Sequence, residues 1–239
     1  MTGTDTDTGT DTGAGTDTGT GSDFLLTTRV FYDTIADDYA THFRDGLAAR
    51  PLDRAVLTGF AELIGKGGEG GRVADLGCGP GLLTAYLDSL GLSPFGIDLS
   101  PRMVELARRE HPGLHFSQGS MLELDLPDGD LAGVVAWYSV IHTPVDLLPA
   151  LFTEFARVLA PGGHLLTAFQ VGDDPLHLDR PWGHPVSLDF HRRQPDRMAE
   201  LLEASGFELR ARMVREPDTD IGESTPQAFL IARKGLPAG

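Results

Sequence analysis

Short runs of apolar residues recur along the middle of the chain, and stretches with helical spacing separate them. The run from Leu131 to Trp137 is uninterrupted, as expected of a strand that is buried on both faces. The stretch from Leu148 to Leu159 places apolar residues at i, i+3, i+4, i+7 and i+11, which predicts an amphipathic helix. A shorter helix is predicted from Pro101 to Glu110, where Met103 belongs to the buried stripe.

Strand and helix patterns alternate from residue 72 to residue 171, which predicts an α/β fold built on a parallel sheet with right-handed crossovers. The alternation ends at Gly172. The following stretch, 172–195, is rich in Asp, Pro, His and Arg and is predicted to be an insertion. A helix near 196–204 and strands at 207–215 and 227–233 complete the prediction.

The first 22 residues consist almost wholly of Thr, Gly and Asp. Such a segment cannot bury enough apolar surface to offset its chain entropy, so we predict a disordered tail over 1–22 and a single folded domain over 23–239. Helices are expected over 27–64. Within them Tyr32, Ile35 and Tyr39 share one helical face, where the two tyrosines either pack into the core or close over a ligand as a lid.

The charge balance excludes some functions. The formal net charge is −16 and no basic cluster is present, which argues against binding to nucleic acid or to an anionic membrane surface. The single cysteine, Cys78, rules out an internal disulfide and suits a reducing compartment. No apolar run approaches the roughly 20 residues of a membrane span. A cytoplasmic location is therefore expected, and the oligomeric state is left open.

The chemistry is concentrated where the first predicted strand ends. Gly77, Gly79 and Gly81 follow it on alternate positions, and a helix pattern begins at once. Glycines at such a turn permit positive φ angles and close approach of a ligand. A second strand ends in Asp98, 21 residues after Gly77, and this spacing lets a carboxylate accept hydrogen bonds from both hydroxyls of a ribose.

Two residues of the loop distinguish between nucleotides. Asp75 would repel a pyrophosphate but attract an ammonium group, and Pro80 removes one main-chain N–H donor. A ligand with a ribose and an amino-acid part but no phosphate fits better than a dinucleotide. S-adenosylmethionine is such a ligand.

The motifs ADLGCGPG (74–81) and GIDLS (96–100), with LAPGG (159–163) before the fifth strand, resemble those of the class I methyltransferases. The resemblance implies a seven-stranded, mostly parallel sheet in the order 3-2-1-4-5-7-6, with the last strand antiparallel. It also implies that Ser120, where the family usually has an acid, and Met121 hold the adenine. The full set of residues expected to bind the cofactor is Tyr32, Tyr39, Asp75, Gly77, Gly79, Asp98, Leu99, Met103, Ser120, Met121 and Trp137.

Proton transfer from an acceptor near neutral pH suits a histidine, and His142 follows the fourth strand at the edge where ligands bind. His142 is therefore the predicted general base, with a purely structural role as the alternative. Tyr138, Trp182 and His191 are predicted to line the acceptor site, which places the insertion 172–195 on the substrate side. His177, His184 and His191 stand seven residues apart, but prolines interrupt the stretch and no metal site is predicted.

The predicted function is methyl transfer from S-adenosylmethionine to an oxygen or nitrogen of a small molecule, with specialised metabolites suggested by family analogy alone. DNA methyltransferases are disfavoured, because the fourth strand is followed by Tyr-Ser-Val-Ile (138–141) rather than by their Pro-Pro or Pro-Cys motifs. Two alternatives stay open: a non-catalytic protein that binds S-adenosylmethionine, and an NAD-dependent oxidoreductase.

Overall fold

The computed structural model describes residues 19–65 and 71–236, with side chains from Asp23 onward. Residues 1–18 of the predicted tail lie outside this range. The first helix, α1, begins at Gly19, so the last four residues assigned to the tail are helical. Composition alone missed this start because an established helix extends at the cost of only one residue's freedom per added hydrogen bond.

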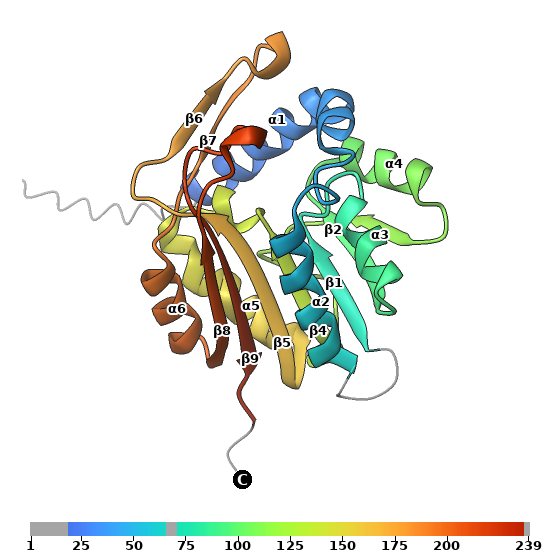
Figure 1. Cartoon of the computed structure of the whole chain (residues 1–239), viewed down its shortest axis with the longest axis vertical. Helices are drawn as coiled ribbons and strands as arrows, with labels where there is room; N and C mark the ends of the chain where they lie inside the picture. Colours follow the sequence, from blue (N-terminus) through green and yellow to red (C-terminus); the bar gives the residue numbers. More distant parts are fainter. Residues whose placement is uncertain (1–18, 66–70, 237–239) are drawn as a thin grey trace, which may run out of the picture.

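The elements alternate along the chain as predicted (Figure 1). The helices are α1 (Gly19–Phe43), α2 (Pro51–Gly65), α3 (Leu82–Ser89), α4 (Pro101–Glu110), α5 (Leu148–Val158) and α6 (Pro195–Ala204), with short 3₁₀ helices η1 (Val140–His142), η2 (Val145–Leu147), η3 (Pro181–Gly183) and η4 (Thr219–Ile221). The strands are β1 (Arg72–Leu76), β2 (Ser93–Asp98), β3 (His115–Gln118), β4 (Leu131–Trp137), β5 (Leu159–Gln170), β6 (Leu176–Asp179), β7 (Ser187–Phe190), β8 (Phe207–Arg215) and β9 (Gln227–Lys234).

Seven strands form one sheet in the order β3-β2-β1-β4-β5-β9-β8, and β9 runs antiparallel to both of its neighbours. Because β8 and β9 are the sixth and seventh strands of this sheet along the chain, the predicted order is confirmed. The hairpin of β6 and β7 was not predicted and stands apart from the sheet.

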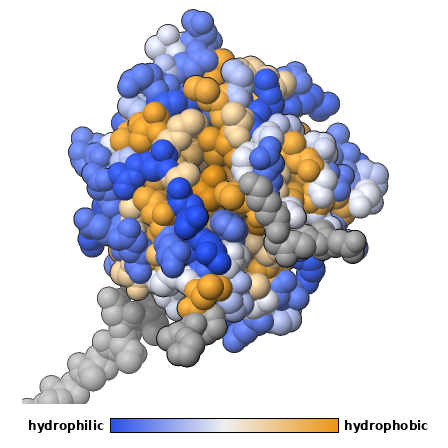
Figure 2. Space-filling view, turned by 60° about the horizontal axis from the view of Figure 1, so that its bottom comes forward, coloured by the Kyte–Doolittle hydropathy of each residue, from blue (hydrophilic) through white to orange (hydrophobic). Residues whose placement is uncertain are grey.

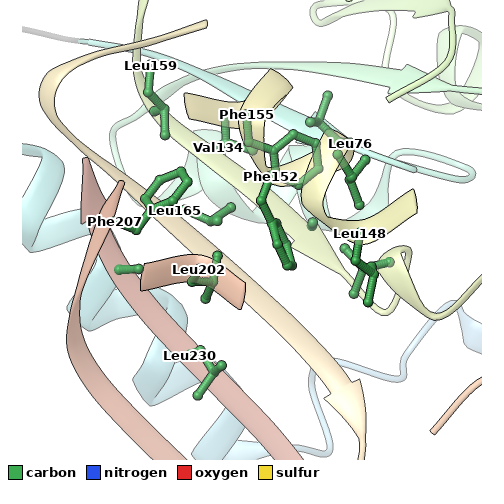
Figure 3. Packing of buried hydrophobic residues seen from close by; sticks show 14 of the residues in the cluster. Leu76, Val134, Leu148, Phe152, Phe155, Leu159, Leu165, Leu202, Phe207 and Leu230 are labelled. Carbon is green, nitrogen blue, oxygen red and sulfur yellow. The ribbon is translucent and has the colours of Figure 1, made fainter. Parts of the chain in front are cut away.

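The core explains why β4 is apolar throughout. Val134 faces one side of the sheet, where α5 and α6 pack, and Phe152 and Leu202 meet it there (Figure 3). Val135 faces the opposite side and packs in a cluster with Phe60 of α2. Both side chains are fully buried, so a polar residue at either position would lose its hydration on one face or the other.

The β6–β7 hairpin packs against α1 rather than against the sheet. Leu188 and Phe190 of β7 share an apolar cluster with Phe31 and Ile35 of α1, and the two segments lie side by side in Figure 1. His184 Nε2 also lies 2.7 Å from a carboxylate oxygen of Asp38, which adds a polar link between them. Helix α1 and the hairpin therefore form one cover above the edge of the sheet, and we call these two segments the roof.

Exposed apolar side chains lie between hydrophilic ones on the face of the molecule drawn in Figure 2. Two apolar residues of α1, Leu26 and Val30, have exposed fractions of 61% and 47%. Within 19–65 and 71–236, no helix is both long and apolar enough to cross a membrane.

Candidate cofactor and acceptor site

A pocket with about 790 Å³ of empty volume, its mouth included, opens where β1, β2 and β4 end, and α1 lies across it. Its lining residues are Phe24, Leu25, Thr28, Arg29, Tyr32, Tyr39, Gly77, Gly79, Ile97, Asp98, Leu99, Ser100, Met103, Gly119, Ser120, Met121, Leu122, Trp137, Tyr138, Ser139, His142 and Thr143. Of the eleven residues predicted to bind the cofactor, all except Asp75 are among them.

The glycine loop forms the floor of the pocket. Gly77 has a φ of 75°, and a Cβ added there would lie 2.4 Å from the Cβ of Ser139, so this position allows β1 and β4 to end side by side. Gly79 has a φ of 53°, and the nearest atom to an added Cβ belongs to Tyr39, 3.9 Å away. A side chain at Gly79 would therefore stand in van der Waals contact with the Tyr39 ring, and both residues line the pocket.

Asp98 lies at the end of β2 and is 9% exposed. Its Oδ2 accepts a hydrogen bond from the Gly79 N–H and its Oδ1 accepts one from the Ser100 N–H, both at 2.8 Å. Burial raises the pKa of this carboxyl to about 6. A carboxylate offers about four lone-pair positions, so each oxygen keeps capacity for a further donor from a ligand.

Asp75 does not reach the pocket, which corrects the prediction that it contacts the cofactor directly. It is 1% exposed and its Oδ2 accepts a hydrogen bond of 2.6 Å from the Thr84 hydroxyl of α3. Burial raises the pKa of Asp75 to about 7. The position of Asp75 on β1 was predictable from the sequence, but the direction of its side chain, which packs against Thr84 of α3, was not.

Helix α1 is fastened to the start of α4. Ser100 caps α4 by accepting a hydrogen bond from the Met103 N–H, and its hydroxyl donates to Asp33 Oδ1 at 2.6 Å. Asp33 also accepts a hydrogen bond from the Arg102 N–H at 3.2 Å, where a carboxylate is favoured by the helix dipole. This attachment holds the face of α1 that carries Tyr32 and Tyr39 over the pocket.

His142 lies on η1, directly after the strained end of β4, where Tyr138 has a φ of 54°. Its Nε2 is 2.7 Å from the Tyr32 hydroxyl, and Nδ1 has no hydrogen-bond partner among the described residues. Burial lowers the pKa of His142 to about 3, so the imidazole is neutral at physiological pH. The neutral ring can accept a proton.

Two of the three predicted acceptor-site residues lie elsewhere. Trp182 is 47% exposed at the tip of the hairpin, where its ring lies 5.5 Å from that of His42, so the prediction that it lines the pocket is wrong. His191 is also absent from the lining, although its main-chain N–H donates to the Ile141 carbonyl at 2.9 Å. The β6–β7 hairpin carries the insertion away from the pocket. Of the three predicted acceptor-site residues, Tyr138 alone lines the pocket.

The histidines of the insertion are separated in the structure. His177 Nδ1 contacts Asp189 across the hairpin at 2.7 Å, whereas His184 contacts Asp38 of α1. In the part of the chain that the structure describes, no three His, Cys, Asp or Glu side chains come together as a metal site would require.

Several lining residues were not anticipated. Phe24, Leu25 and Thr28 extend the pocket-facing stripe of α1 toward its start, and their spacing from Tyr32 carried the helical signal that could have found them. Ser139 was not predicted, because its place in the pocket lining depends on the turn after β4. The hydroxyls of Thr28 and Ser139 are buried, and neither has a hydrogen-bond partner among the described residues.

Comparison with known proteins agrees with this geometry. Residues 73–163 match the methyltransferase domain family, and this range contains the glycine loop, Asp98 and His142. The chain belongs to the class I methyltransferases. The cofactor of this family is S-adenosyl-L-methionine.

Among curated proteins, this methyltransferase chain is similar to O-methyltransferase cnsE of Penicillium expansum, with 32% identity over 181 residues that cover 72% of this chain and 62% of the relative. It is also similar to trans-aconitate 2-methyltransferase of Methylobacterium nodulans, with 41% identity over 114 residues that cover 44% and 41% of the two chains. The chain therefore spans less than two thirds of the length of these relatives.

Among solved structures, 1,6-didemethyltoxoflavin-N1-methyltransferase of Burkholderia thailandensis shares the fold, with a TM-score of 0.65, 21% sequence identity and coverage of 90% of both chains.

The residues present fit S-adenosylmethionine. A buried carboxylate with free acceptor capacity, the backbone of Gly77 and Gly79, and two hydroxyls that lack partners among the described residues face one pocket. No phosphate is needed to explain these features.

Proposed function

We propose that this protein transfers a methyl group from S-adenosylmethionine to an oxygen or nitrogen atom of a small-molecule acceptor. The observation that carries the proposal is the placement of Asp98 and the Tyr32–His142 pair on the same pocket. Asp98 can accept hydrogen bonds from the ribose of the cofactor, and the Tyr32–His142 pair can take up the proton of the acceptor. Because the chain spans only part of its curated relatives, the activity is inferred from its own site.

In this proposal Asp98 accepts hydrogen bonds from the ribose hydroxyls, and the adenine lies among Leu99, Met103, Ser120 and Met121. The aminoacyl end lies against Gly77 and Gly79 of the glycine loop, beside Tyr39. When bound, the cofactor supplies an electrophilic methyl group on a positively charged sulfur, and the acceptor attacks that carbon in line. Tyr32 and Trp137 close the walls around this position and exclude water.

The proton of the acceptor leaves toward His142. Since Tyr32 occupies Nε2, the proton passes to the Tyr32 oxygen as the phenol proton moves to Nε2, and an imidazolium is formed. Burial raises the pKa of Tyr32 well above 10, which keeps the phenol protonated and able to donate. An imidazole of low basicity suffices when the proton leaves an oxygen that already carries the new methyl group, because such an oxonium is a strong acid.

The acceptor half of the pocket supports a small molecule with an apolar body. Phe24, Leu25 and Leu122 supply apolar surface, while Ser139 and Thr143 supply hydroxyls. The curated relative cnsE is named as an O-methyltransferase, and the toxoflavin enzyme as an N-methyltransferase, so both acceptor atoms remain within the proposal. An origin of the acceptor among specialised metabolites rests on analogy.

Two measurements test the proposal. Calorimetry should give saturable binding of S-adenosylmethionine and none of NAD, and binding of NAD alone would refute it. Incubation with metabolite extracts and S-adenosylmethionine should yield S-adenosylhomocysteine and a product heavier by one methyl group. Binding without turnover across such extracts would favour the non-catalytic alternative.

Cofactor affinity should depend on pH through Asp98. The ionised carboxylate accepts from the ribose, and its pKa is raised to about 6, so affinity is full above pH 7 and falls as the pH drops through 6. The limiting slope is about tenfold per pH unit. Calorimetry between pH 5 and pH 8 measures it.

An Asp75→Asn variant is the control, since the pKa of Asp75 is raised to about 7 and its side chain lies outside the pocket. This variant should keep the same pH dependence. Equal affinity at pH 5 and pH 8 in the unmodified protein would contradict the ribose assignment.

A further inference from the structure

The end of the insertion runs along the η1 turn that carries His142. The His191 N–H donates to the Ile141 carbonyl at 2.9 Å, and the Arg193 guanidinium donates from its Nη2 to the Thr143 carbonyl. These two carbonyls lie one residue before and one residue after His142. The η1 turn is therefore hydrogen-bonded on both sides of His142 by the short segment His191–Arg193, and Arg193 lies 50 residues after its partner Thr143.

Arg193 is itself anchored to the sheet. Its main-chain N–H donates to the Gln170 carbonyl at the end of β5 at 2.9 Å, and it forms a parallel bridge with Val171. The Arg193 backbone therefore cannot follow η1 if the turn moves. The side chain spans from this fixed point to Thr143, which lines the pocket.

The partners of the guanidinium are unusual for a structural arginine. Arg193 is half-buried, its Nε has no partner, and no carboxylate forms an ion pair with it within the described residues. Burying a cation without an anionic partner is costly, and burial accordingly lowers the pKa of Arg193. A role in stability alone offers no reason to keep this charge beside a neutral carbonyl.

The groups around His142 show where that charge acts. Tyr32 reaches it from α1, and the Phe190 ring of β7 lies edge-on, with 4.9 Å between ring centroids. Burial is the largest cause of the lowered pKa of His142; the Asp189 main chain opposes this lowering, whereas His191 and Arg193 add to it. Arg193 is the permanent cation in this set.

We propose that Arg193 is a positioning residue for His142, fixing the η1 turn so that the imidazole Nε2 stays aligned with the Tyr32 hydroxyl. Its positive charge also adds to the effect of burial in disfavouring protonation of the imidazole. The inference rests on the proposed role of His142 in methyl transfer, but its consequences for the ring can be read without an acceptor.

The test compares two variants. Arg193→Gln removes the positive charge and keeps an amide donor, whereas Arg193→Lys keeps the charge and removes the planar guanidinium group. Arg197→Gln is the control, because Arg197 is exposed on α6 and pairs only with Glu200. The His142 ring is titrated by NMR in the free protein from pH 2 to 8, a range that includes the pKa of about 3 in the unmodified protein. Calorimetry gives the affinity for S-adenosylmethionine, and thermal unfolding reports folding.

In Arg193→Gln the imidazole should titrate at a higher pH than in the unmodified protein, by about one pH unit or more. Methyl incorporation from tritiated S-adenosylmethionine into metabolite extract should fall about tenfold, with cofactor affinity within twofold. In Arg193→Lys the pKa of His142 should stay unchanged, while part of the methyl-transfer rate should be lost. In Arg197→Gln both the pKa of His142 and the methyl-transfer rate should stay unchanged.

Identical titrations of His142 in the Gln variant and the unmodified protein would overturn the inference, as would loss of cofactor affinity in step with rate. If the Gln variant fails to fold, an unchanged rate in Arg193→Lys overturns it as well. Failure of the proposed function would show itself separately, as absence of cofactor binding or turnover in the unmodified protein.

Discussion

Replacing His142 with alanine is expected to lower kcat for methyl transfer about 10²–10⁴-fold while the affinity for S-adenosylmethionine stays within about twofold. The neutral imidazole is the group in the pocket that can take the acceptor's proton, and its removal leaves the Tyr32 hydroxyl without its 2.7 Å partner. Release of S-adenosylhomocysteine, with the acceptor identified by the mass-shift screen, measures the effect.

Two variants make this experiment specific. His177→Ala removes an exposed histidine that contacts only Asp189 of the hairpin, and it should retain the full rate. Tyr32→Phe keeps the ring and removes the hydroxyl, so it should lose about as much rate as His142→Ala if the proton passes through the phenol. An undiminished rate in His142→Ala would reduce this residue to a structural part of η1.

The second large effect concerns the cofactor. Asp98→Ala should weaken binding of S-adenosylmethionine by about 1.5–3 kcal/mol, which is about 10- to 150-fold, because hydrogen bonds to a charged acceptor are lost. The same change frees the N–H groups of Gly79 and Ser100, so the loop and the start of α4 lose their common acceptor. Calorimetry measures the affinity, and thermal unfolding establishes that the variant is folded.

Asp98→Asn is the matched variant, since it keeps the shape and one acceptor oxygen but removes the charge. Its affinity should lie between those of the alanine variant and the unmodified protein. Unchanged affinity in Asp98→Ala would mean that the ribose lies elsewhere and that Asp98 serves only the loop.

The sheet and the cofactor half of the pocket were predictable because their signals are local. A strand buried on both faces is apolar throughout, and Leu131–Trp137 has this pattern over its full length. Asp98 was identified by a fixed spacing from Gly77, and the loop and the strand end that carry these residues meet in the fold, where Gly77 donates to the Ile97 carbonyl at 2.7 Å.

The surroundings of His142 were not predictable in the same way. Arg193 contacts the η1 turn across 50 residues of sequence, and no periodicity encodes such a contact. Trp182 was misplaced because aromatic character suggested a pocket wall, whereas the hairpin carries it to the surface. Asp75 was correct in charge but wrong in direction, since side-chain orientation depends on packing against Thr84.

The joint packing of α1 and β7 has a consequence for how ligands enter and leave. The roof is made of two pieces of chain about 150 residues apart, yet they share one apolar cluster and the Phe190 ring touches both Phe31 and His142. If α1 moved away from the sheet without the β6–β7 hairpin, this apolar cluster would be exposed to water. We therefore expect α1 and the hairpin to move together when a ligand enters or leaves. Binding of S-adenosylmethionine in the pocket should then slow amide hydrogen exchange in Ser187–Phe190, although none of these residues lines the pocket.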